Sequence, residues 1–246
     1  MELLFLKEID STNKYAKEHL CELADKTLVY ADMQTAGRGR FQRKWASNSG
    51  KNIYASIVLK PSNDLKEVYS NLTQYLSLVL AETIEEYINL KTNTAPYTKI
   101  KWPNDVRIDG KKISGILAES VLEGNNLKGI VLGFGVNLNC SKEDMEKIDQ
   151  PATSLNLEAG MEIDRDKFLE KVVDKFCLRY NKFIEEGFLL IRDDYIRRAE
   201  FLDRTVAVKV FDNEITGVAK EITGSGALKI VDKDNKEHVL LIGDIL

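Results

Sequence analysis

The feature that most constrains the fold is a dense run of strand-like segments in the middle of the chain, preceded by one long amphipathic helix. Apolar residues recur at intervals of three and four across residues 65–90, which predicts a helix with one buried face, capped by Asn63 or Asp64. Four strand-like stretches follow, at residues 99–102, 106–108, 113–120 and 127–137. The Asp109-Gly110 pair between two of them is typical of a tight hairpin turn. Because closely spaced strands pair with their neighbours, the pattern indicates an α+β fold, a mixed β-sheet with helices packed on one face.

The segments on either side extend the same pattern. Further strands are predicted at residues 3–6, 28–31 and 53–59, and further helices at residues 11–24, 164–186 and 188–199. Asp10 or Ser11 is positioned to cap the first of these helices, and Asp164 or Asp166 the second. Gly133 and Gly135 interrupt the last central strand, and glycine weakens a strand unless a ligand or a backbone approaches closely there.

The character of the sequence changes near residue 200. Val206, Val208 and Val210 alternate with other residues, and turn-forming pairs then separate four or five short strands up to Leu246. About 45 residues of this kind are typical of a small β-barrel or SH3-like module. We therefore predict two domains, residues 1–200 and residues 201–246.

Composition excludes several classes of function. The 246 residues include 35 basic and 39 acidic side chains, so a net negative field opposes general binding to nucleic acid. No apolar run is long enough to span a bilayer, and the N-terminus lacks the pattern of a signal peptide, so a cytoplasmic location is predicted. The three cysteines have no metal-binding or disulfide spacing, and the two histidines offer little support for a His-rich metal site or a Ser-His-Asp unit.

The segment between Met33 and Asn63 is locally basic. It contains six Lys or Arg residues and no acidic residue, although the chain as a whole is acidic. Within it, Gly37 and Gly39 alternate with Arg38 and Arg40, which lets the backbone approach a ligand closely while the guanidinium groups grip an anion. The segment is either an anion-binding loop or a solvated loop without a ligand.

Three motifs together identify a resemblance. The chain has no Walker A loop and no complete G-x-G-x-x-G sequence. It has instead G-R-G-R-F-Q-R-K-W from Gly37, K-W-P-N-D from Lys101 followed by G-K-K-I-S-G-I-L, and G-F-G-V-N-L-N from Gly133. In order and spacing these motifs, with the early S-T-N, Gln34 and the terminal β module, resemble biotin–protein ligases over essentially the whole chain.

The resemblance implies a two-step, ATP-dependent reaction. Biotin and MgATP form biotinyl-5′-AMP and pyrophosphate, and a lysine of a biotin carboxyl carrier protein, from acetyl-CoA carboxylase or another biotin-dependent carboxylase, then displaces AMP. ATP and Mg²⁺ are the implied cofactors, and the enzyme is a biotin–[acetyl-CoA-carboxylase] ligase. Because the catalytic motifs begin at the N-terminus, the chain resembles the monofunctional form, without a DNA-binding domain, and no DNA or membrane binding is expected. It is expected to be a monomer or a homodimer.

Matching positions carry the implied roles. The biotin site comprises Ser11, Thr12, Asn13, Gln34, Arg38, Gly39, Arg40, Lys112 and Gly115. The ATP site comprises Arg40, Arg43, Trp45 and Asn137, with no dedicated metal site and Mg²⁺ arriving with ATP near Asn137. Arg40, Lys112 and Asp105 are the implied catalytic residues, and Asp105 orients or deprotonates the incoming lysine amine.

The sequence departs from the family pattern at one place and leaves three rival functions open. Phe41-Gln42 stands where the family often has a further basic or small residue, which bears on how the loop packs. The first rival is a lipoate–protein ligase or octanoyl transferase, which shares the fold and the lysine-acylation logic. The second is a module that binds single-stranded nucleic acid, and the third is a catalytically silent biotin-binding protein.

Overall fold

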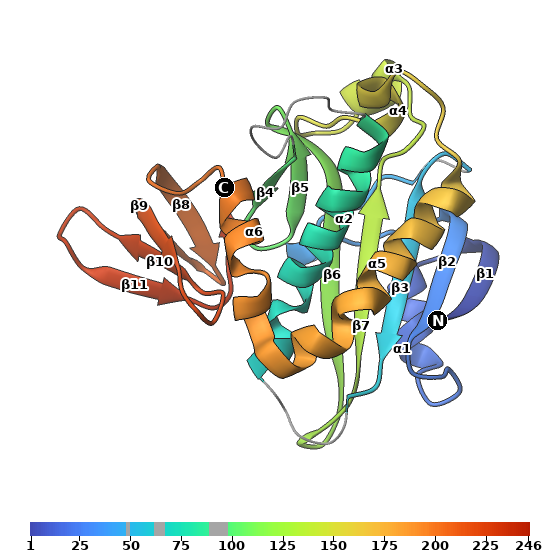
Figure 1. Ribbon diagram of the computed structural model, residues 1–246, viewed down its shortest axis with the longest axis horizontal. Coiled ribbons are helices and arrows are strands. Elements are labelled where there is room, and N and C mark those ends of the chain that lie inside the picture. Colours follow the sequence, from blue (N-terminus) through green and yellow to red (C-terminus); the bar gives the residue numbers. More distant parts are fainter. Residues whose placement is uncertain (48–49, 62–66, 89–97) are drawn as a thin grey trace.

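Two β-sheets organise the protein in the computed structural model, which describes residues 1–47, 50–61, 67–88 and 98–246 (Figure 1). The larger sheet has seven strands in the order β1-β2-β3-β7-β6-β5-β4. Their bounds are β1 Glu2–Ile9, β2 Thr27–Gln34, β3 Ile53–Leu59, β4 Lys99–Lys101, β5 Asp105–Ile108, β6 Lys111–Glu123 and β7 Asn126–Val136. The pair β1–β2 is parallel and the other neighbours are antiparallel, so the predicted mixed sheet is confirmed.

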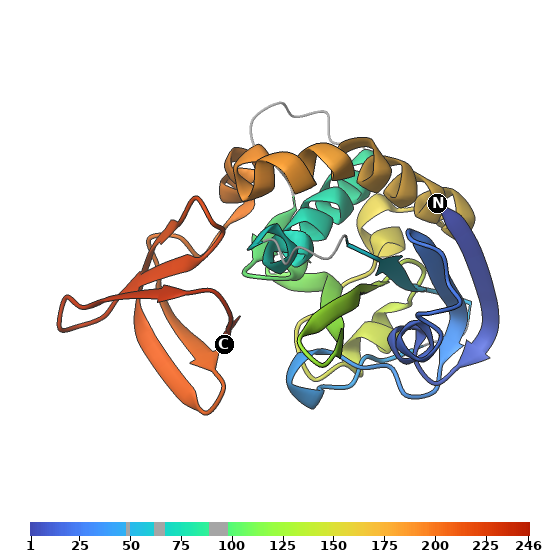
Figure 2. The same cartoon turned by 90° about the horizontal axis from the view of Figure 1, so that it is seen from below.

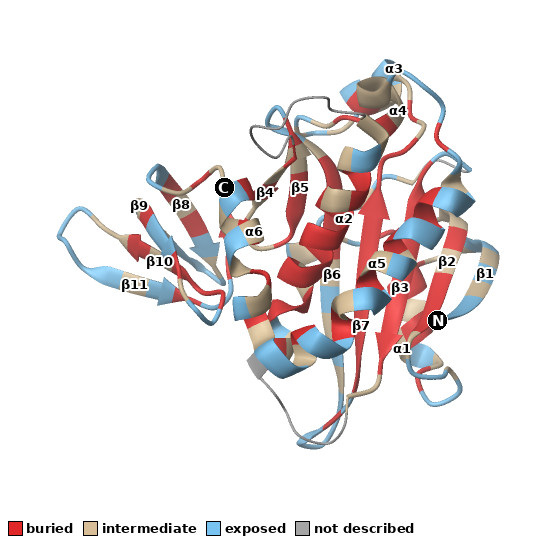
Figure 3. Ribbon diagram, viewed as in Figure 1, coloured by how far each residue is buried: buried red, intermediate tan, exposed pale blue. Residues whose placement is uncertain are grey.

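One face of this sheet is covered by two long helices, α2 (Leu72–Ile88) and α5 (Arg165–Glu186), which pack side by side (Figure 1). A 3₁₀ turn, η2 (Glu67–Asn71), precedes α2, and the caps predicted at residues 63 and 64 lie outside the described residues. Asp164 caps α5 as predicted, with its side chain accepting a hydrogen bond from the Lys167 N–H. Buried residues concentrate on the inner strands and on α2 (Figure 3).

The opposite face is covered by α1 (Thr12–Glu18), so the prediction of helices on one face was wrong. The strands alternate: Leu28 belongs to the cluster under α2, whereas its neighbour Val29 packs with Ala16 of α1. Both faces of the inner strands are apolar, and both therefore need a cover. Helix α1 is also shorter than the predicted 11–24, because turns replace it after Glu18.

Three short features were not anticipated in detail. Two helices of about one turn, α3 (Lys142–Glu146) and α4 (Leu155–Ala159), follow β7. The helix predicted at residues 188–199 is divided into a 3₁₀ turn, η3 (Gly187–Leu190), and α6 (Arg192–Arg198). Segments this short carry no readable hydrophobic period, so sequence alone gives little signal for them.

The second sheet is antiparallel and has the order β11-β10-β9-β8-β12. Its strands are β8 Thr205–Val210, β9 Asn213–Ile222, β10 Leu228–Val231, β11 Glu237–Leu240 and β12 Asp244–Ile245. It lies beside α6 at one end of the molecule (Figures 1 and 2). Trp102 Nε1 and Gln74 Nε2 both donate to the Gly226 carbonyl, in the turn between β9 and β10, at 3.3 and 2.8 Å. The domain boundary at residue 200, which falls between α6 and β8, stays a proposal.

Candidate active site

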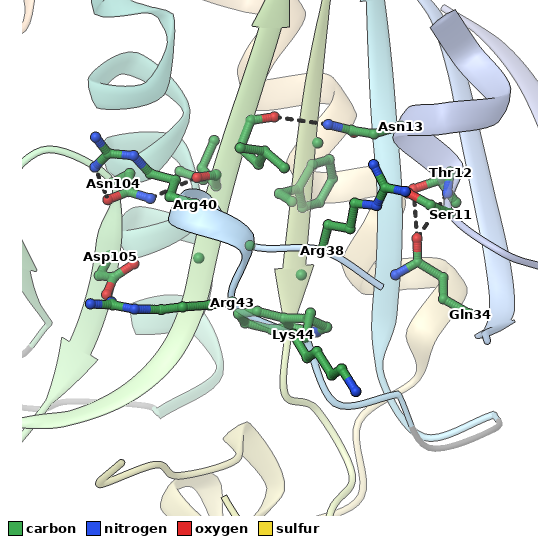
Figure 4. A pocket seen from close by; sticks show the side chains of 18 of the residues that line it. Ser11, Thr12, Asn13, Gln34, Arg38, Arg40, Arg43, Lys44, Asn104 and Asp105 are labelled. Carbon is green, nitrogen blue, oxygen red and sulfur yellow. Dashed lines mark hydrogen bonds between the residues drawn. The ribbon is translucent and has the colours of Figure 1, made fainter. Parts of the chain in front are cut away.

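A pocket forms where the N-terminus of α1, the end of β2, the basic loop and strands β5 to β7 meet (Figure 4). Every site residue named from the sequence lines it, with the exception of Asn137. The lining includes Ser11, Thr12, Asn13, Gln34, Arg38, Gly39, Arg40, Arg43, Trp45, Asp105, Lys112 and Gly115. The fold thus brings Ser11 and Gly115, which are far apart in the sequence, to one cavity.

The S-T-N segment forms one end of the pocket and also begins α1. Ser11 is the N-cap residue, and its side chain accepts from the Lys14 N–H. The Thr12 N–H donates to Gln34 Oε1 at 2.8 Å, which ties the helix start to the end of β2. Capping and pocket lining are therefore compatible roles of the same residues.

The basic loop folds as a hairpin. The Gly39 N–H donates to the Arg43 carbonyl at 2.7 Å, and the Trp45 N–H donates to the Gly37 carbonyl at 3.0 Å. Phe41 forms the tip with a φ of +52°, a left-handed conformation that is uncommon for a residue other than glycine. This turn lets Arg40 and Arg43 reach neighbouring parts of the protein.

Two of the three arginines of the hairpin contact the C-terminal segment. Arg40 donates to Asn104 Oδ1 at 3.2 Å and to the Gly243 carbonyl at 2.7 Å, and Arg43 Nη1 lies 2.9 Å from Asp244 Oδ2. Burial lowers the pKa of Arg40, while the carboxylates of Asp244 and Asp105 oppose that shift. A guanidinium nevertheless keeps its charge in a protein, so Arg40 remains a cation.

Three of these partners were missed from the sequence. Asn104 lies within the K-W-P-N-D motif, and its place in that motif could have identified it as a site residue. Gly243 and Asp244 belong to the terminal β module, where no recognisable motif marks them. Only the folded structure brings Asp244 to the pocket and the Gly243 carbonyl to Arg40.

Lys112 and Asp105 form an ion pair inside the pocket. Their charged atoms lie 2.8 Å apart, and the side chains are 14% and 8% exposed. They project from β6 and β5, which are neighbouring antiparallel strands. The Lys112 ammonium has three N–H donors, so it can bind a ligand anion while it remains close to Asp105.

Glycines form the floor of the pocket. Neighbouring side chains lie so close to them that a Cβ atom would not fit. Gly115 and Gly135 are paired across β6 and β7, and the indole of Trp45 lies over both. A Cβ atom on Gly135 would lie 2.4 Å from Trp45 Cε2, and one on Gly133 would lie 2.0 Å from Asn13 Oδ1. The sequence predicted close approach of a ligand or a backbone to Gly133 and Gly135, whereas in the structure the approaching groups are side chains.

Asn137 lies outside this pocket. It follows the end of β7, is buried, and donates through Nδ2 to the Thr153 carbonyl at 3.0 Å. Its backbone N–H donates to the Ile113 carbonyl, and the residue lines a separate cavity together with Ala46 and Asn52. Its expected contact with the nucleotide phosphates or Mg²⁺ stays a prediction.

Comparison with known proteins assigns the chain to a family. Residues 5–137 match the model of the Biotin/lipoate A/B protein ligase family. The chain belongs to this family. It is 33% identical over 243 residues to the bifunctional ligase/repressor BirA of Bacillus subtilis, an alignment that covers 94% of this chain and 73% of that protein. It is 32% identical over 225 residues to the biotin–[acetyl-CoA-carboxylase] ligase of Paracoccus denitrificans, with 91% of each covered.

Solved structures extend the similarity to the whole fold. The biotin protein ligase from Aquifex aeolicus, solved in complex with biotin and ATP, superposes with a TM-score of 0.78 at 32% identity. The match covers 100% of this chain and 97% of that one. The predicted catalytic fold with an SH3-like C-terminal module is confirmed, and so is the prediction that this family member is a ligase. None of the described helices is long and apolar enough to cross a membrane.

Proposed function

We propose that this family member is an ATP-dependent biotin–protein ligase. It forms biotinyl-5′-AMP from biotin and MgATP and transfers biotin to a lysine of a biotin carboxyl carrier protein domain. The observation that supports this most is one pocket with a polar end, at Ser11, Thr12 and Gln34. The same pocket is also lined by several arginine and lysine side chains. A relative of the same fold was solved with biotin and ATP, the two ligands that such a pocket suits.

The cations answer the main electrostatic difficulty of the first step. A carboxylate that attacks an α-phosphate brings two anions together, and unit charges 4 Å apart repel by about 4 kcal/mol at an effective dielectric constant of about 20. Arg38, Arg40, Arg43 and Lys112 line the same pocket and offset this repulsion. They also stabilise the charge that develops at phosphorus.

Each part of the pocket receives a role in this proposal. Ser11, Thr12, Asn13 and Gln34 hold the biotin head group. Arg38 and Gly39 cover biotin and the adenylate, Lys112 holds the biotin carboxylate and the bridging phosphate, and Gly115 permits close approach. Trp45 stacks near the adenine, and Arg40 and Arg43 bind the phosphates.

The second step uses the partner of Lys112. When Lys112 binds the adenylate, the Asp105 carboxylate lies next to it and can orient the incoming lysine amine. The amine nitrogen forms a bond to the biotinyl carbonyl carbon, the bond from that carbon to the phosphate oxygen breaks, and AMP leaves. Asp105 accepts the amine proton.

Magnesium arrives with ATP in this scheme. Asp105 and Asp244 are carboxylates, the ligand type that Mg²⁺ prefers, but each is paired with a cation, Lys112 or Arg43. Among the described residues no group of three His, Cys, Asp or Glu side chains is placed to hold a metal ion. These residues do not fit a protein-built metal cage, so no step is assigned to a protein-bound ion.

A lipoate–protein ligase or octanoyl transferase is the alternative, since the family model includes both biotin and lipoate enzymes. The polar lining near Thr12 and Gln34 favours a head group with hydrogen-bonding atoms over an octanoyl chain.

The test of the complete function is transfer of label to an acceptor. The purified protein is incubated with MgATP, labelled biotin and a biotin carboxyl carrier protein domain, and with the same domain in which the target lysine is replaced by arginine. Label on the first domain and none on the second is expected. Label on neither, from folded ligase, would overturn the proposal. A cytoplasmic location, the absence of DNA binding and a monomeric or homodimeric state remain predictions.

A further inference from the structure

A chain of hydrogen bonds runs behind the polar end of the pocket through two residues that do not line it. Ser56 of β3 is fully buried, and its Oγ lies 2.6 Å from Asn13 Oδ1 and 2.8 Å from Thr12 Oγ1. Glu119 of β6 accepts from Asn13 Nδ2 at 2.8 Å, and its second carboxylate oxygen is paired with Lys17 of α1. The chain thus links a surface ion pair to a wall of the pocket.

The orientation of the Asn13 amide is determined by its partners. Nδ2 donates to the Leu117 carbonyl at 3.1 Å and to the Glu119 carboxylate (Figure 4 shows the first of these bonds). An ionised carboxylate and a carbonyl can only accept, so the amide nitrogen must face them and Oδ1 must face Ser56. Asn13 also presses against Gly133, where an added Cβ would lie 2.0 Å from Oδ1, so the amide is tightly held.

This orientation sets the direction of the next two hydrogen bonds. Ser56 Oγ donates to Asn13 Oδ1 at 2.6 Å and to Thr12 Oγ1 at 2.8 Å, so its one proton is shared between these two acceptors. Thr12 is thus the acceptor in its contact with Ser56. Its own hydroxyl proton is donated to Gln34 Oε1 at 3.2 Å.

The result is a pocket wall with defined polarity. Thr12 donates its proton to Gln34 Oε1, so it has none left for a ligand and offers that ligand a lone pair as an acceptor. Gln34 Oε1 already accepts the Thr12 N–H, which leaves the Gln34 amide nitrogen as a donor. An acceptor and a donor therefore lie side by side at the end of the pocket (Figure 4).

We propose that Ser56 and Glu119 are positioning residues that determine head-group selectivity, because they fix Thr12 as an acceptor beside the Gln34 donor. This inference rests on the proposed function. The ureido ring of biotin has N–H donors next to a carbonyl acceptor and matches that pattern. The dithiolane of lipoate and the methyl end of octanoate have no such donors and would leave both groups unpaired, which a site built for hydrogen bonding penalises heavily.

The test begins with Ser56→Ala and Glu119→Ala in ATP–pyrophosphate exchange driven by biotin. Each change is expected to raise KM for biotin about tenfold, the usual consequence of losing a buried hydrogen-bond partner, with little change in kcat and in KM for ATP. Ser77→Ala is the matched control, since Ser77 is a buried serine of α2 that donates to the Gln74 carbonyl away from the pocket. An unchanged KM for biotin in both variants, or an equal rise in KM for ATP, overturns the inference.

Biotin analogues test the polarity directly on the unaltered protein. Desthiobiotin keeps the ureido ring and is expected to support exchange, whereas 2-iminobiotin replaces the carbonyl acceptor by a C=NH group and is expected to be a poor substrate. In Ser56→Ala, the difference in exchange activity between biotin and 2-iminobiotin is expected to be smaller than in the unaltered protein. Equal use of both by the unaltered protein contradicts the inference even if Ser56→Ala fails to fold. Failure of the unaltered protein to exchange with biotin would instead overturn the proposed function itself.

Discussion

Gly135→Ala tests the close packing of the pocket floor. The new methyl group would lie 2.4 Å from Trp45 Cε2 and 2.6 Å from Cζ2, whereas carbon atoms in favourable contact are about 3.5–4.0 Å apart. The indole must therefore move by about 1 Å or more. It cannot move toward Gly115 without crowding Lys112, whose Nζ lies 5.5 Å from the centre of the ring.

The cost of this movement divides unequally between stability and activity. Overpacking a rigid core costs about 1–3 kcal/mol, but Trp45 is only half-buried on a hairpin that can shift, so we expect a loss of about 1 kcal/mol in the free energy of unfolding. The hairpin also positions Arg40 and Arg43, and a misplacement of about 1 Å in an active site costs about 100-fold in rate. We therefore expect exchange activity to fall about 100-fold in a protein that remains folded.

Urea unfolding and ATP–pyrophosphate exchange measure the two quantities on the same preparation. Gly224→Ala is the matched control, because a Cβ there would meet only Leu189 Cδ2, at an ordinary 3.5 Å. Activity of Gly135→Ala close to that of the control would refute the reasoning. A loss of stability beyond about 3 kcal/mol would show that the hairpin cannot shift as argued.

Three further predictions concern charges. Asp244→Asn removes the counter-ion of Arg43. The Arg43 side chain is 54% exposed, so the ion pair contributes about 1 kcal/mol at most, and KM for ATP should rise by no more than about fivefold. An unchanged KM for ATP would contradict the role of the C-terminal sheet. Lys112→Met leaves the buried Asp105 carboxylate unpaired and should lower the free energy of unfolding, measured with urea, by about 3 kcal/mol. The double variant Lys112→Met with Asp105→Asn should regain most of that free energy. No regain would contradict the pairing. Burial raises the pKa of Tyr195 above its ordinary 10.0. Its contribution to stability is therefore complete below pH 10.0 and is lost as pH rises further, because only the unfolded state ionises. Equal free energies of unfolding at pH 8 and pH 11, in buffers of equal ionic strength, would contradict this prediction.

Local signals in the sequence were sufficient for much of the fold. The strand predicted at residues 53–59 is confirmed at both ends. The Asp109-Gly110 turn is confirmed as well, with φ of +48° and +74°, since a tight hairpin requires positive φ at both positions. The placement of α1 was mispredicted, because an apolar period shows that a helix has one buried face but does not show which face of the sheet it covers.

The candidate site was predictable only where motifs mark it. Arg38, Arg40 and Lys112 stand in recognisable motifs, and the structure brings them to one pocket. Asp244 and Ser56 have no local signal, since each acts through a contact with a segment distant in the sequence. Asn137 also stands in a motif but does not line this pocket, and its Nδ2 donates to the Thr153 carbonyl, so its role at the nucleotide stays a prediction.

The most direct test of the central claim is ATP–pyrophosphate exchange by the purified protein, with biotin, lipoate and octanoate compared in parallel. Exchange measures formation of an acyl-adenylate without any acceptor protein, so it isolates the step to which Arg40 and Lys112 are assigned. We predict exchange with biotin, none above background with the other two acids, and loss of exchange in Arg40→Ala. Exchange with lipoate or octanoate in place of biotin would contradict the assigned substrate, and silence with all three acids in folded protein supplied with Mg²⁺ would contradict the ligase mechanism.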